Sequence, residues 1–207
     1  MKQRLLNHIN SITDPLLRGA CETIFNHDKF FVCPAAIGFH HAYEGGLLVH
    51  TVEVCDIALG MSVLTTNQNL AKPWCGHDIL IAAALFHDLI KIKEYDSFWD
   101  FPANTVGQRL LRIPGTDESG LQKFWKHTDY GKSIGHICGS AAAFQTAADY
   151  RGVSFATIEA VTHCILAHHG RKEWGSPVEP QTLEALILHQ ADMLSAKFGA
   201  TKDIAPQ

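Results

Sequence analysis

Apolar residues recur along most of this chain at intervals of three and four, the spacing of one face of a helix. One such stripe consists of Leu47, His50, Val54 and Ala58. It predicts a long helix from about 43 to 64. The segment 79–86 is apolar nearly all round, so a helix over 78–91, capped by Asp78, is predicted to be the buried central one. No tight Asn-Gly or Asp-Gly turn joins alternating β-branched runs, and the pattern therefore predicts an all-α bundle.

Capping residues locate further helices. Asp14 followed by Pro15 predicts a helix that reaches about residue 26. Ser154 predicts the start of another helix, and Gly170 predicts its left-handed end. The remaining assignments are a break at Lys72-Pro73, a connecting loop over 28–42, an irregular insertion with short helical pieces over 97–127, and helices over 129–150 and 182–198.

Composition limits the class of protein. The chain has 207 residues, 46% of them hydrophobic and 18% charged, which suits a packed core and excludes a disordered tail. Without internal repeats or a composition boundary, residues 1–207 are predicted to form a single domain with its core at about 10–198. A net charge of −4 excludes a strongly basic nucleic-acid coat protein.

Targeting signals and cysteine pairs are not apparent. The longest apolar run, 79–86, is far shorter than the roughly 20 residues of a membrane span, and the first residues contain no apolar signal core. The six cysteines form no C-x-x-C pair, so neither a zinc ribbon nor a disulfide framework is indicated. A cytoplasmic protein without a membrane association is the expectation, with the cysteines serving as small core residues.

Histidine is abundant, with thirteen in the chain, and several lie within apolar helices. His50 is on a buried stripe, His87-Asp88 directly follows an apolar run, and Asp192 is on the core-facing side of the last helix. An ionised carboxylate in such a core is costly unless it is paired. These four residues are therefore predicted to bind a divalent metal, with imidazole and carboxylate ligands that suit Mn, Fe, Co, Ni or Zn and tolerate Mg.

A second histidine group strengthens this interpretation. His136 and the doublet His168-His169 lie on later helices, and with a bridging Asp88 they could hold a second ion about 3.5–4 Å from the first. Lys91 follows Asp88 by three residues and shares its helical face, where an ammonium could neutralise a phosphate or protonate a leaving oxygen.

The order H…HD…H…HH…D resembles the HD superfamily of metal-dependent phosphohydrolases, which have an all-α fold. The similarity is strongest to the HD domain of the YhaM-type 3′–5′ exoribonucleases. It rests on five segments: HHAYEGGLLVHTVEV (40–54), ALFHDLIKIKEY (84–95), GHICG (135–139), ILAHHGRKEWGSP (165–177) and EALILHQADMLSAK (184–197). The resemblance implies a helical bundle with a buried metal centre and hydrolysis of phosphoesters.

Carried over by position, the resemblance implies two sets of metal ligands. His50, His87, Asp88 and Asp192 would hold the first ion, and His136, His168 and His169 a second ion bridged by Asp88. Lys91 matches the lysine of the HD-x-x-K pattern.

This sequence departs from the family pattern at three places. Ile90 replaces the usual small residue, and Val49 stands where the exoribonucleases often carry Glu. No nucleic-acid-binding barrel precedes the domain, so a stand-alone phosphodiesterase or nucleotidase is expected as readily as an RNA-degrading enzyme.

The leading hypothesis is a metal-dependent phosphohydrolase that uses a metal-activated water on a nucleotide or short nucleic acid, with Asp88 and Lys91 as catalytic residues. His41 and Arg171 are predicted to contact the substrate, and aromatic and basic residues in the insertion 97–127 could stack on a nucleotide. Two alternatives keep the metal centre: a di-iron oxygenase of the same fold, and a metal-stabilised binding module without catalysis.

Overall fold

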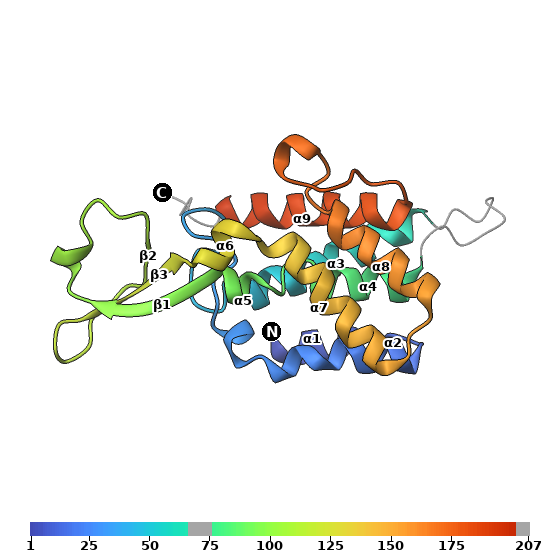
Figure 1. Cartoon of the computed structure of the whole chain (residues 1–207), viewed down its shortest axis with the longest axis horizontal. Coiled ribbons are helices and arrows are strands. Elements are labelled where there is room, and N and C mark those ends of the chain that lie inside the picture. Colours follow the sequence, from blue (N-terminus) through green and yellow to red (C-terminus); the bar gives the residue numbers. More distant parts are fainter. Residues whose placement is uncertain (66–75, 202–207) are drawn as a thin grey trace.

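The computed structural model describes residues 1–65 and 76–201 of the chain. The predicted break at Lys72-Pro73 and the cysteine at position 75 lie outside the described residues. The helices of the described part are α1 (Lys2–Asn10), α2 (Pro15–Cys21), α3 (Gly46–Thr65), α4 (His77–Phe86), α5 (Lys91–Glu94), α6 (Asp129–Ser133), α7 (His136–Arg151), α8 (Phe155–Ala167) and α9 (Leu183–Thr201), as Figure 1 shows. Short 3₁₀ segments are η1 (Glu22–Asn26), η2 (Asp28–Phe31), η3 (Pro102–Thr105) and η4 (Lys172–Trp174). The predicted helical bundle is confirmed.

The apolar helix α4 is at the centre of the bundle, as its sequence predicts. Every residue from Leu80 to Phe86 is buried. Around it pack α1, α2, α3, α7, α8 and α9. A helix that is apolar on every side can be stable in water only when it is surrounded in this way.

Helix α3 is long and apolar enough to cross a membrane by length and composition alone, over Gly46–Val63 with a mean hydropathy of 1.5. Half of that window is buried inside the protein, where α3 packs against α4 and α9. A single helix that is partly buried in this way is weak evidence for a membrane span.

Two predicted helices are interrupted. The helix predicted over 78–91 ends at Phe86 and continues as α5 only after a tight turn, in which Lys91 N–H donates to Asp88 O. The helix predicted over 129–150 is divided at Gly135, whose φ of +71° is a left-handed conformation. Both interruptions lie beside predicted metal ligands.

The interpretation of Asp78 as a helix cap is wrong. Helix α4 begins at His77, one residue before Asp78, with Gly76 as its N-cap. The Asp78 carboxylate instead accepts hydrogen bonds from Thr13 and from Asp14 N–H, before α2. It therefore joins the start of α2 to the first turn of α4.

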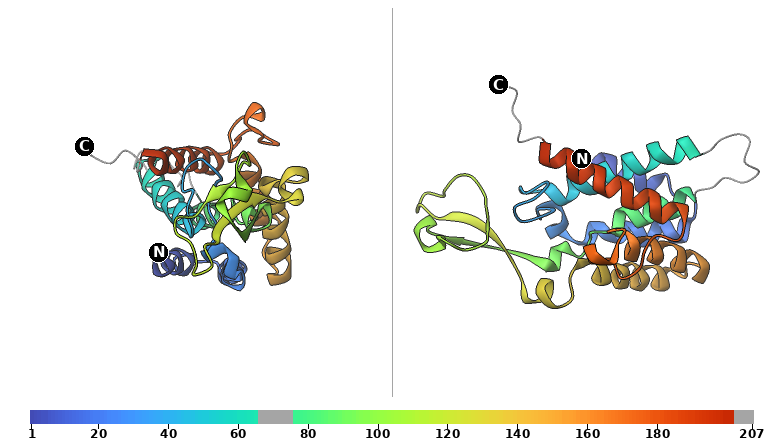
Figure 2. Two further views of the ribbon diagram at one scale, coloured as in Figure 1. Left: turned by 90° about the vertical axis from the view of Figure 1, so that its left-hand side faces the viewer. Right: turned by 90° about the horizontal axis from the view of Figure 1, so that it is seen from above.

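The prediction of short helical pieces over 97–127 is also wrong, apart from η3. The segment forms an antiparallel sheet of three strands in the order β1-β3-β2: β1 (Tyr95–Asp100), β2 (Leu111–Arg112) and β3 (Gln122–His127). In the register, Trp99 pairs with Lys123 and Leu111 with Trp125. Figures 1 and 2 show that this sheet and its loops project from one end of the helical body. We call residues 95–127 the arm.

Candidate metal centre

Four predicted ligands meet between three helices. His50 comes from α3, His87 and Asp88 from the turn after α4, and Asp192 from α9. Nε2 of His50 lies 3.1 Å from Oδ1 of Asp192 and 3.4 Å from Oδ2 of Asp88. Nε2 of His87 lies 3.3 Å from Nε2 of His50. The structure therefore brings these four residues to one point.

The second histidine group lies on the other side of Asp88. His136 is the first residue of α7, and His168 and His169 directly follow α8. Oδ1 of Asp88 lies 3.3 Å from Nε2 of His136 and 3.8 Å from Nε2 of His168. The rings of His168 and His169 are 4.5 Å apart between centroids. Each oxygen of one carboxylate thus faces one cluster of imidazoles.

Hydrogen bonds at Nδ1 fix the orientation of these rings. The Nδ1–H group of His87 donates to Ala84 O (2.8 Å), that of His168 to Ile165 O (2.7 Å) and that of His169 to Trp174 O (2.9 Å). The Nδ1–H group of His136 donates to Glu94 Oε2 (2.7 Å), and that of His50 to Ser195 Oγ (2.9 Å). The carbonyl and carboxylate partners can only accept, so they assign the proton to Nδ1. An imidazole held in this way presents Nε2 as a ligand, which is the usual arrangement around bound metals.

The centre leaves buried polar atoms without protein partners. Oδ1 of Asp88, Nε2 of His136 and Nε2 of His168 are buried and make no hydrogen bond within the described part of the chain. Groups of this kind are nearly always satisfied in native proteins. A cation between them would satisfy all three atoms. The residues present therefore fit a metal ion, and the clusters His50–His87–Asp192 and His136–His168–His169 are each compact enough to hold one.

The protonation states also suit metal binding. Burial would raise the pKa values of Asp88 and Asp192, but the neighbouring cationic and imidazole groups lower both below their usual range. Burial and the adjacent imidazoles lower the pKa of His168. Ionised carboxylates and a neutral imidazole are the forms that coordinate metals.

Lys91 is part of the same centre. Its Nζ lies 2.6 Å from Oδ2 of Asp88, and only 8% of its side chain is exposed. Burial would lower the pKa of Lys91, but the Asp88 carboxylate raises it, so the ammonium stays charged. The centre therefore contains a fixed positive charge beside the bridging carboxylate.

Ile90, the departure from the family pattern, is accommodated by a glycine. A Cβ added at Gly139 would lie 2.7 Å from Cγ2 of Ile90, which is too close. Ile90 is buried against α7 at this point, and its N–H donates to Oγ of Ser140. The bulky residue thus packs against a small one on α7.

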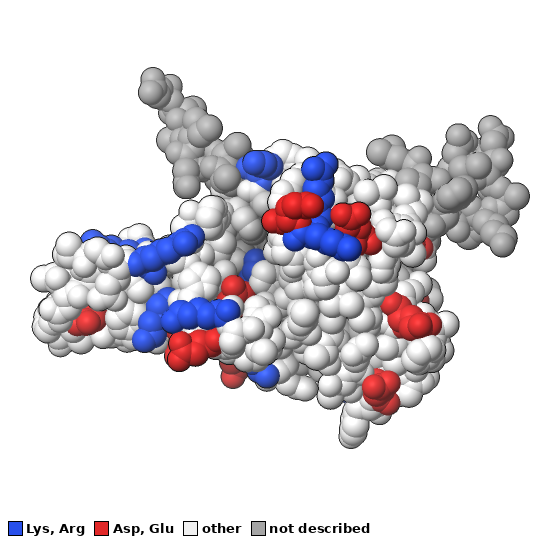
Figure 3. Space-filling view, turned by 45° about the horizontal axis from the view of Figure 1, so that its top comes forward, with Lys and Arg blue, Asp and Glu red and all other residues white. Residues whose placement is uncertain are grey.

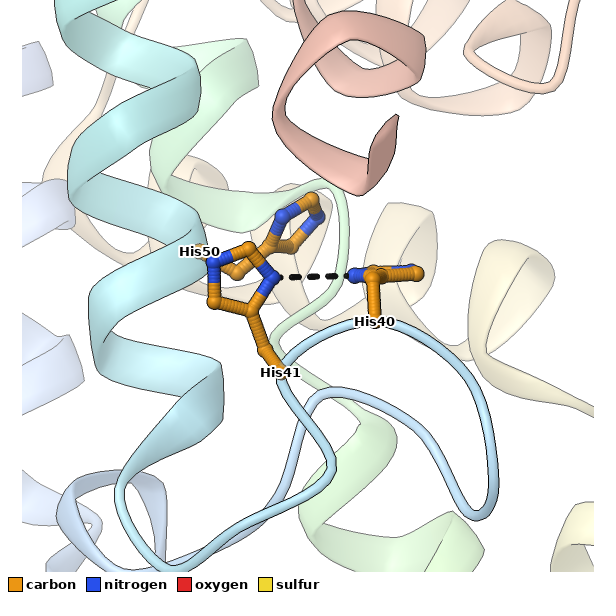
Figure 4. Close-up of side chains that lie close together, drawn as sticks. All are labelled: His40, His41 and His50. Carbon is orange, nitrogen blue, oxygen red and sulfur yellow. Dashed lines mark hydrogen bonds between the residues drawn. The ribbon is translucent and has the colours of Figure 1, made fainter. Parts of the chain in front are cut away.

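A third group of histidines lies beside the centre. Figure 4 shows His40 and His41, from the loop before α3, next to His50. Nδ1 of His40 is 3.1 Å from Nδ1 of His41, and the His40 and His50 rings are 4.7 Å apart. Burial, with His50 and Lys91 nearby, lowers the pKa of His40 to about 3, which keeps this imidazole neutral.

The position of His41 does not support its predicted contact with substrate. Its side chain is completely buried, and Nε2 donates to Oε2 of Glu53 at 3.0 Å. The same Glu53 oxygen accepts from Ser195 Oγ, which in turn accepts from His50. His41 thus belongs to a buried network behind a metal ligand, and His40 is the more exposed member of the doublet.

A small cavity of about 160 Å³ opens onto the centre. It is lined by His169, Trp174, His189, Asp192 and Met193. Arg171 lies at this side of the molecule, with its guanidinium carbon 5.0 Å from the Trp174 ring centroid. His189 donates from Nδ1 to His168 O and so supports the backbone of a predicted ligand. The cavity thus reaches Asp192 and His169 from outside.

Three supporting residues were missed by the sequence analysis: Glu53, Glu94 and Ser195. They follow His50, Lys91 and Asp192 by three positions, respectively. Residues three apart share a helical face, so this spacing was an available signal for Glu53 and Ser195, which follow predicted ligands, but not for Glu94. The exposed Cys138 is a further difference from the prediction that the cysteines are core residues.

A helical bundle in which imidazoles and carboxylates meet at a buried His-Asp doublet is characteristic of one class of metal-binding hydrolases. The model of the HD domain matches residues 47–197, and the chain belongs to this family. HD domains bind divalent metals, and the clusters described above could hold a metal ion.

The curated relatives include the 3′-5′ exoribonuclease YhaM of Geobacillus sp. (strain WCH70), which is 29% identical over 200 residues. The alignment covers 96% of this chain and 52% of the relative, so the chain spans about half the length of that protein. No solved structure matches the chain significantly. The resemblance to HD-domain phosphohydrolases of the YhaM type is confirmed.

Proposed function

We propose that this chain is a two-metal phosphohydrolase that cleaves phosphoester bonds in single-stranded nucleic acid. The exoribonuclease relative supports the substrate class, and the HD family supports hydrolysis rather than oxygenation. The observation that carries the proposal is the bridging position of Asp88. Its two oxygens lie 3.4 Å and 3.3 Å from Nε2 of His50 and His136, which belong to different clusters.

The ligands divide into two sets. His50, His87, Asp192 and one oxygen of Asp88 would hold the first ion, and His136, His168, His169 and the other oxygen of Asp88 the second. Divalent ions held here would polarise the phosphate and lower the pKa of a bound water. The mixture of nitrogen and oxygen donors favours Mn, Fe, Co, Ni or Zn over Mg, which prefers oxygen.

The other side chains of the centre handle charge and orientation. Lys91, held as an ammonium, faces the bridging carboxylate and can stabilise negative charge that develops on a phosphate. Arg171 beside Trp174 is placed to contact a second phosphate near the cavity. Glu94, Ser195 and the backbone carbonyls at 84, 165 and 174 keep the imidazoles oriented while the reaction proceeds.

The test is hydrolysis of bis(p-nitrophenyl) phosphate and of a single-stranded oligoribonucleotide by protein loaded with Mn or Co. We expect turnover of both, with loss of at least about a thousandfold in Asp88→Asn, because both ions lose their shared ligand. Asp129→Asn removes the same charge at a fully exposed position and should have no effect. Hydrolysis by Asp88→Asn at the wild-type rate would refute the proposal. Oxygen consumption without hydrolysis would favour the oxygenase alternative, and metal-dependent stability without either activity would favour a binding module.

A further inference from the structure

The arm begins directly beside the metal centre. Glu94, which holds His136, is the last residue of α5, and β1 begins at the next residue, Tyr95. Directly after β3 ends at His127, Thr128 Oγ1 donates to Lys93 O and Thr128 N–H donates to Glu94 O. The base of the arm is thus anchored beside a predicted ligand, and its strands lead away from the centre (Figures 1 and 2).

The arm also contacts the loop that carries His40. Lys123 forms an ion pair with Glu44, and the guanidinium carbon of Arg109 lies 5.9 Å from the centroid of the Phe39 ring. Phe39 is adjacent in sequence to His40, whose ring lies 4.7 Å from that of His50. These contacts form a continuous connection from the arm to the first metal cluster.

One face of the sheet and this loop present exposed aromatic rings next to cations. Residues paired across antiparallel strands point to the same face, so Trp99 shares a face with Lys123. Trp99 is 53% exposed and Phe39 is 69% exposed. We call Phe39, Trp99, Arg109 and Lys123 the strand-binding face. Exposed aromatic rings interleaved with cations are the usual platform for unpaired bases and their phosphates.

Most carboxylates of the arm have hydrogen-bond or ion-pair partners, whereas most of its cations form no ion pair within the described residues. It contains four cations and four carboxylates: Arg109, Arg112, Lys123 and Lys126, and Asp96, Asp100, Asp117 and Glu118. Asp96 pairs with Lys29, while Asp100 and Asp117 accept hydrogen bonds from their own loops. Arg109, Arg112 and Lys126 have no ion pair within the described residues and lie over aromatic rings. Of these three, only Arg109 belongs to the strand-binding face, since Arg112 and Lys126 lie on the opposite face of the sheet. In Figure 3 Lys and Arg side chains predominate over acidic ones on the arm, at the left.

We propose that the strand-binding face holds single-stranded nucleic acid and guides it past His40 to the metal centre. Bases stack on Trp99 and Phe39, and phosphates contact Arg109 and, in exchange for Glu44, Lys123. This inference rests on the proposed function and adds a binding subsite to it. Because the face offers more than one ring and more than one cation, it favours a strand of several nucleotides over a mononucleotide.

The test measures binding of a fluorescein-labelled, phosphorothioate-linked oligoadenylate of about ten nucleotides by fluorescence anisotropy. The phosphorothioate linkages slow hydrolysis during the measurement. We expect the 207-residue chain to bind this strand more tightly than AMP or a duplex of the same length. Trp99→Ala and Phe39→Ala should each raise Kd about tenfold. Trp99→Phe keeps a ring and should stay within about twofold of wild type.

Arg109→Ala should weaken binding and reduce the slope of log Kd against log salt by about 0.7. The matched controls are Arg112→Ala, since Arg112 pairs with Phe124 on the opposite face of the sheet, and Phe155→Ala, an exposed ring at the start of α8. Both controls should bind the strand as wild type does.

Unchanged binding in Trp99→Ala, Phe39→Ala and Arg109→Ala would overturn the proposal, as would equal affinity for AMP and the strand. Self-association that Trp99→Ala abolishes, without strand binding, would make the face a contact between copies of the chain and would also overturn it. Wild-type hydrolysis of bis(p-nitrophenyl) phosphate is measured in parallel. Its absence would refute the proposed function, whereas loss of strand binding alone would refute only the role of the arm.

Discussion

Nζ of Lys91 lies 2.6 Å from Oδ2 of Asp88, and both side chains are almost completely buried. The same oxygen is 3.4 Å from Nε2 of His50 and from Nε2 of His87, two predicted ligands of the first ion. Lys91 and a metal ion held by the first cluster would therefore share one oxygen of Asp88. We expect Lys91 to balance the charge of Asp88 in metal-free protein and to leave its charge for an anionic substrate once metal is bound.

Replacing Lys91 with Met keeps an unbranched side chain and removes the ammonium. Metal-free Lys91→Met leaves Asp88 without its cationic partner, and breaking a buried ion pair costs about 3–5 kcal/mol. We expect the free energy of unfolding to fall by about that amount in EDTA and to be largely restored by Mn, because the metal replaces the lost charge. Urea unfolding with and without metal measures both.

Lys93→Met is the matched control, because Lys93 is in the same short helix but exposed. It should change stability by no more than about 0.5 kcal/mol in either condition. An equal loss for Lys91→Met with and without Mn would mean that the lysine does not balance the bridging carboxylate.

His136→Ala tests whether the two clusters bind separate ions. It removes an imidazole whose Nε2 faces Oδ1 of Asp88, whereas His50 and His87 face Oδ2, so the first cluster stays complete. We expect metal analysis to give about two ions per chain in wild type, about one in His136→Ala and almost none in Asp88→Asn. Turnover by His136→Ala should fall by a hundredfold or more, on the order expected for loss of one metal. Retention of two ions by this variant would contradict the assignment of His136.

Ser195→Ala tests the network behind His50. Ser195 Oγ accepts from Nδ1 of His50 at 2.9 Å and donates to Glu53 at 3.0 Å. Outer partners of ligating histidines contribute about 10- to 100-fold to metal affinity. We expect a loss of that size in a competition assay with a fluorescent chelator, and Ser195→Thr, which keeps a hydroxyl, should recover part of it. Ser11→Ala, at an exposed serine after α1, is the control. Unchanged affinity in Ser195→Ala would show that the network does not orient His50.

The helices could be predicted because their signal is local. Apolar residues that share a helix face are three or four positions apart, and a cap contacts a residue close to it in sequence, as Ser154 does when it accepts from Thr157 N–H. The sheet has no such signal. Strands β1 and β3 are joined by the long segment 101–121 rather than by a two-residue turn, and their register depends on pairing at a distance. The alternation in β1 is also obscured by its half-exposed residues.

The predicted ligands could be recognised in another way: each is a carboxylate or imidazole within an apolar helix, where such a group needs a partner. That reasoning located His50 and Asp88 but not the residues that support them. Glu94 is an ordinary surface residue in sequence terms, and only the fold shows that it meets His136 at 2.7 Å. The burial of His41 was equally inaccessible, because it depends on packing against Gly199 near the end of α9.

Asp78 gives a prediction that is independent of the metal centre. Partial burial raises the pKa of this carboxyl, but hydrogen bonds from the Thr13 hydroxyl and from Thr13 and Asp14 N–H lower it below its ordinary value. A folded pKa below the unfolded value of about 3.9 means that the carboxylate stabilises the fold at neutral pH. That contribution is lost as the pH falls through the folded pKa.

Asp78→Asn should therefore lower the free energy of unfolding by about 1–2 kcal/mol at pH 7, because a neutral amide accepts these bonds more weakly. The difference from wild type should be constant down to about pH 5 and narrow below about pH 4, where the wild-type carboxyl takes up its proton. Urea unfolding of both proteins in EDTA over this range measures it. Asp149→Asn, an exposed substitution near the end of α7, should stay within about 0.5 kcal/mol of wild type. A difference for Asp78→Asn that is independent of pH would mean that lost packing, rather than the carboxylate charge, joins α2 to α4.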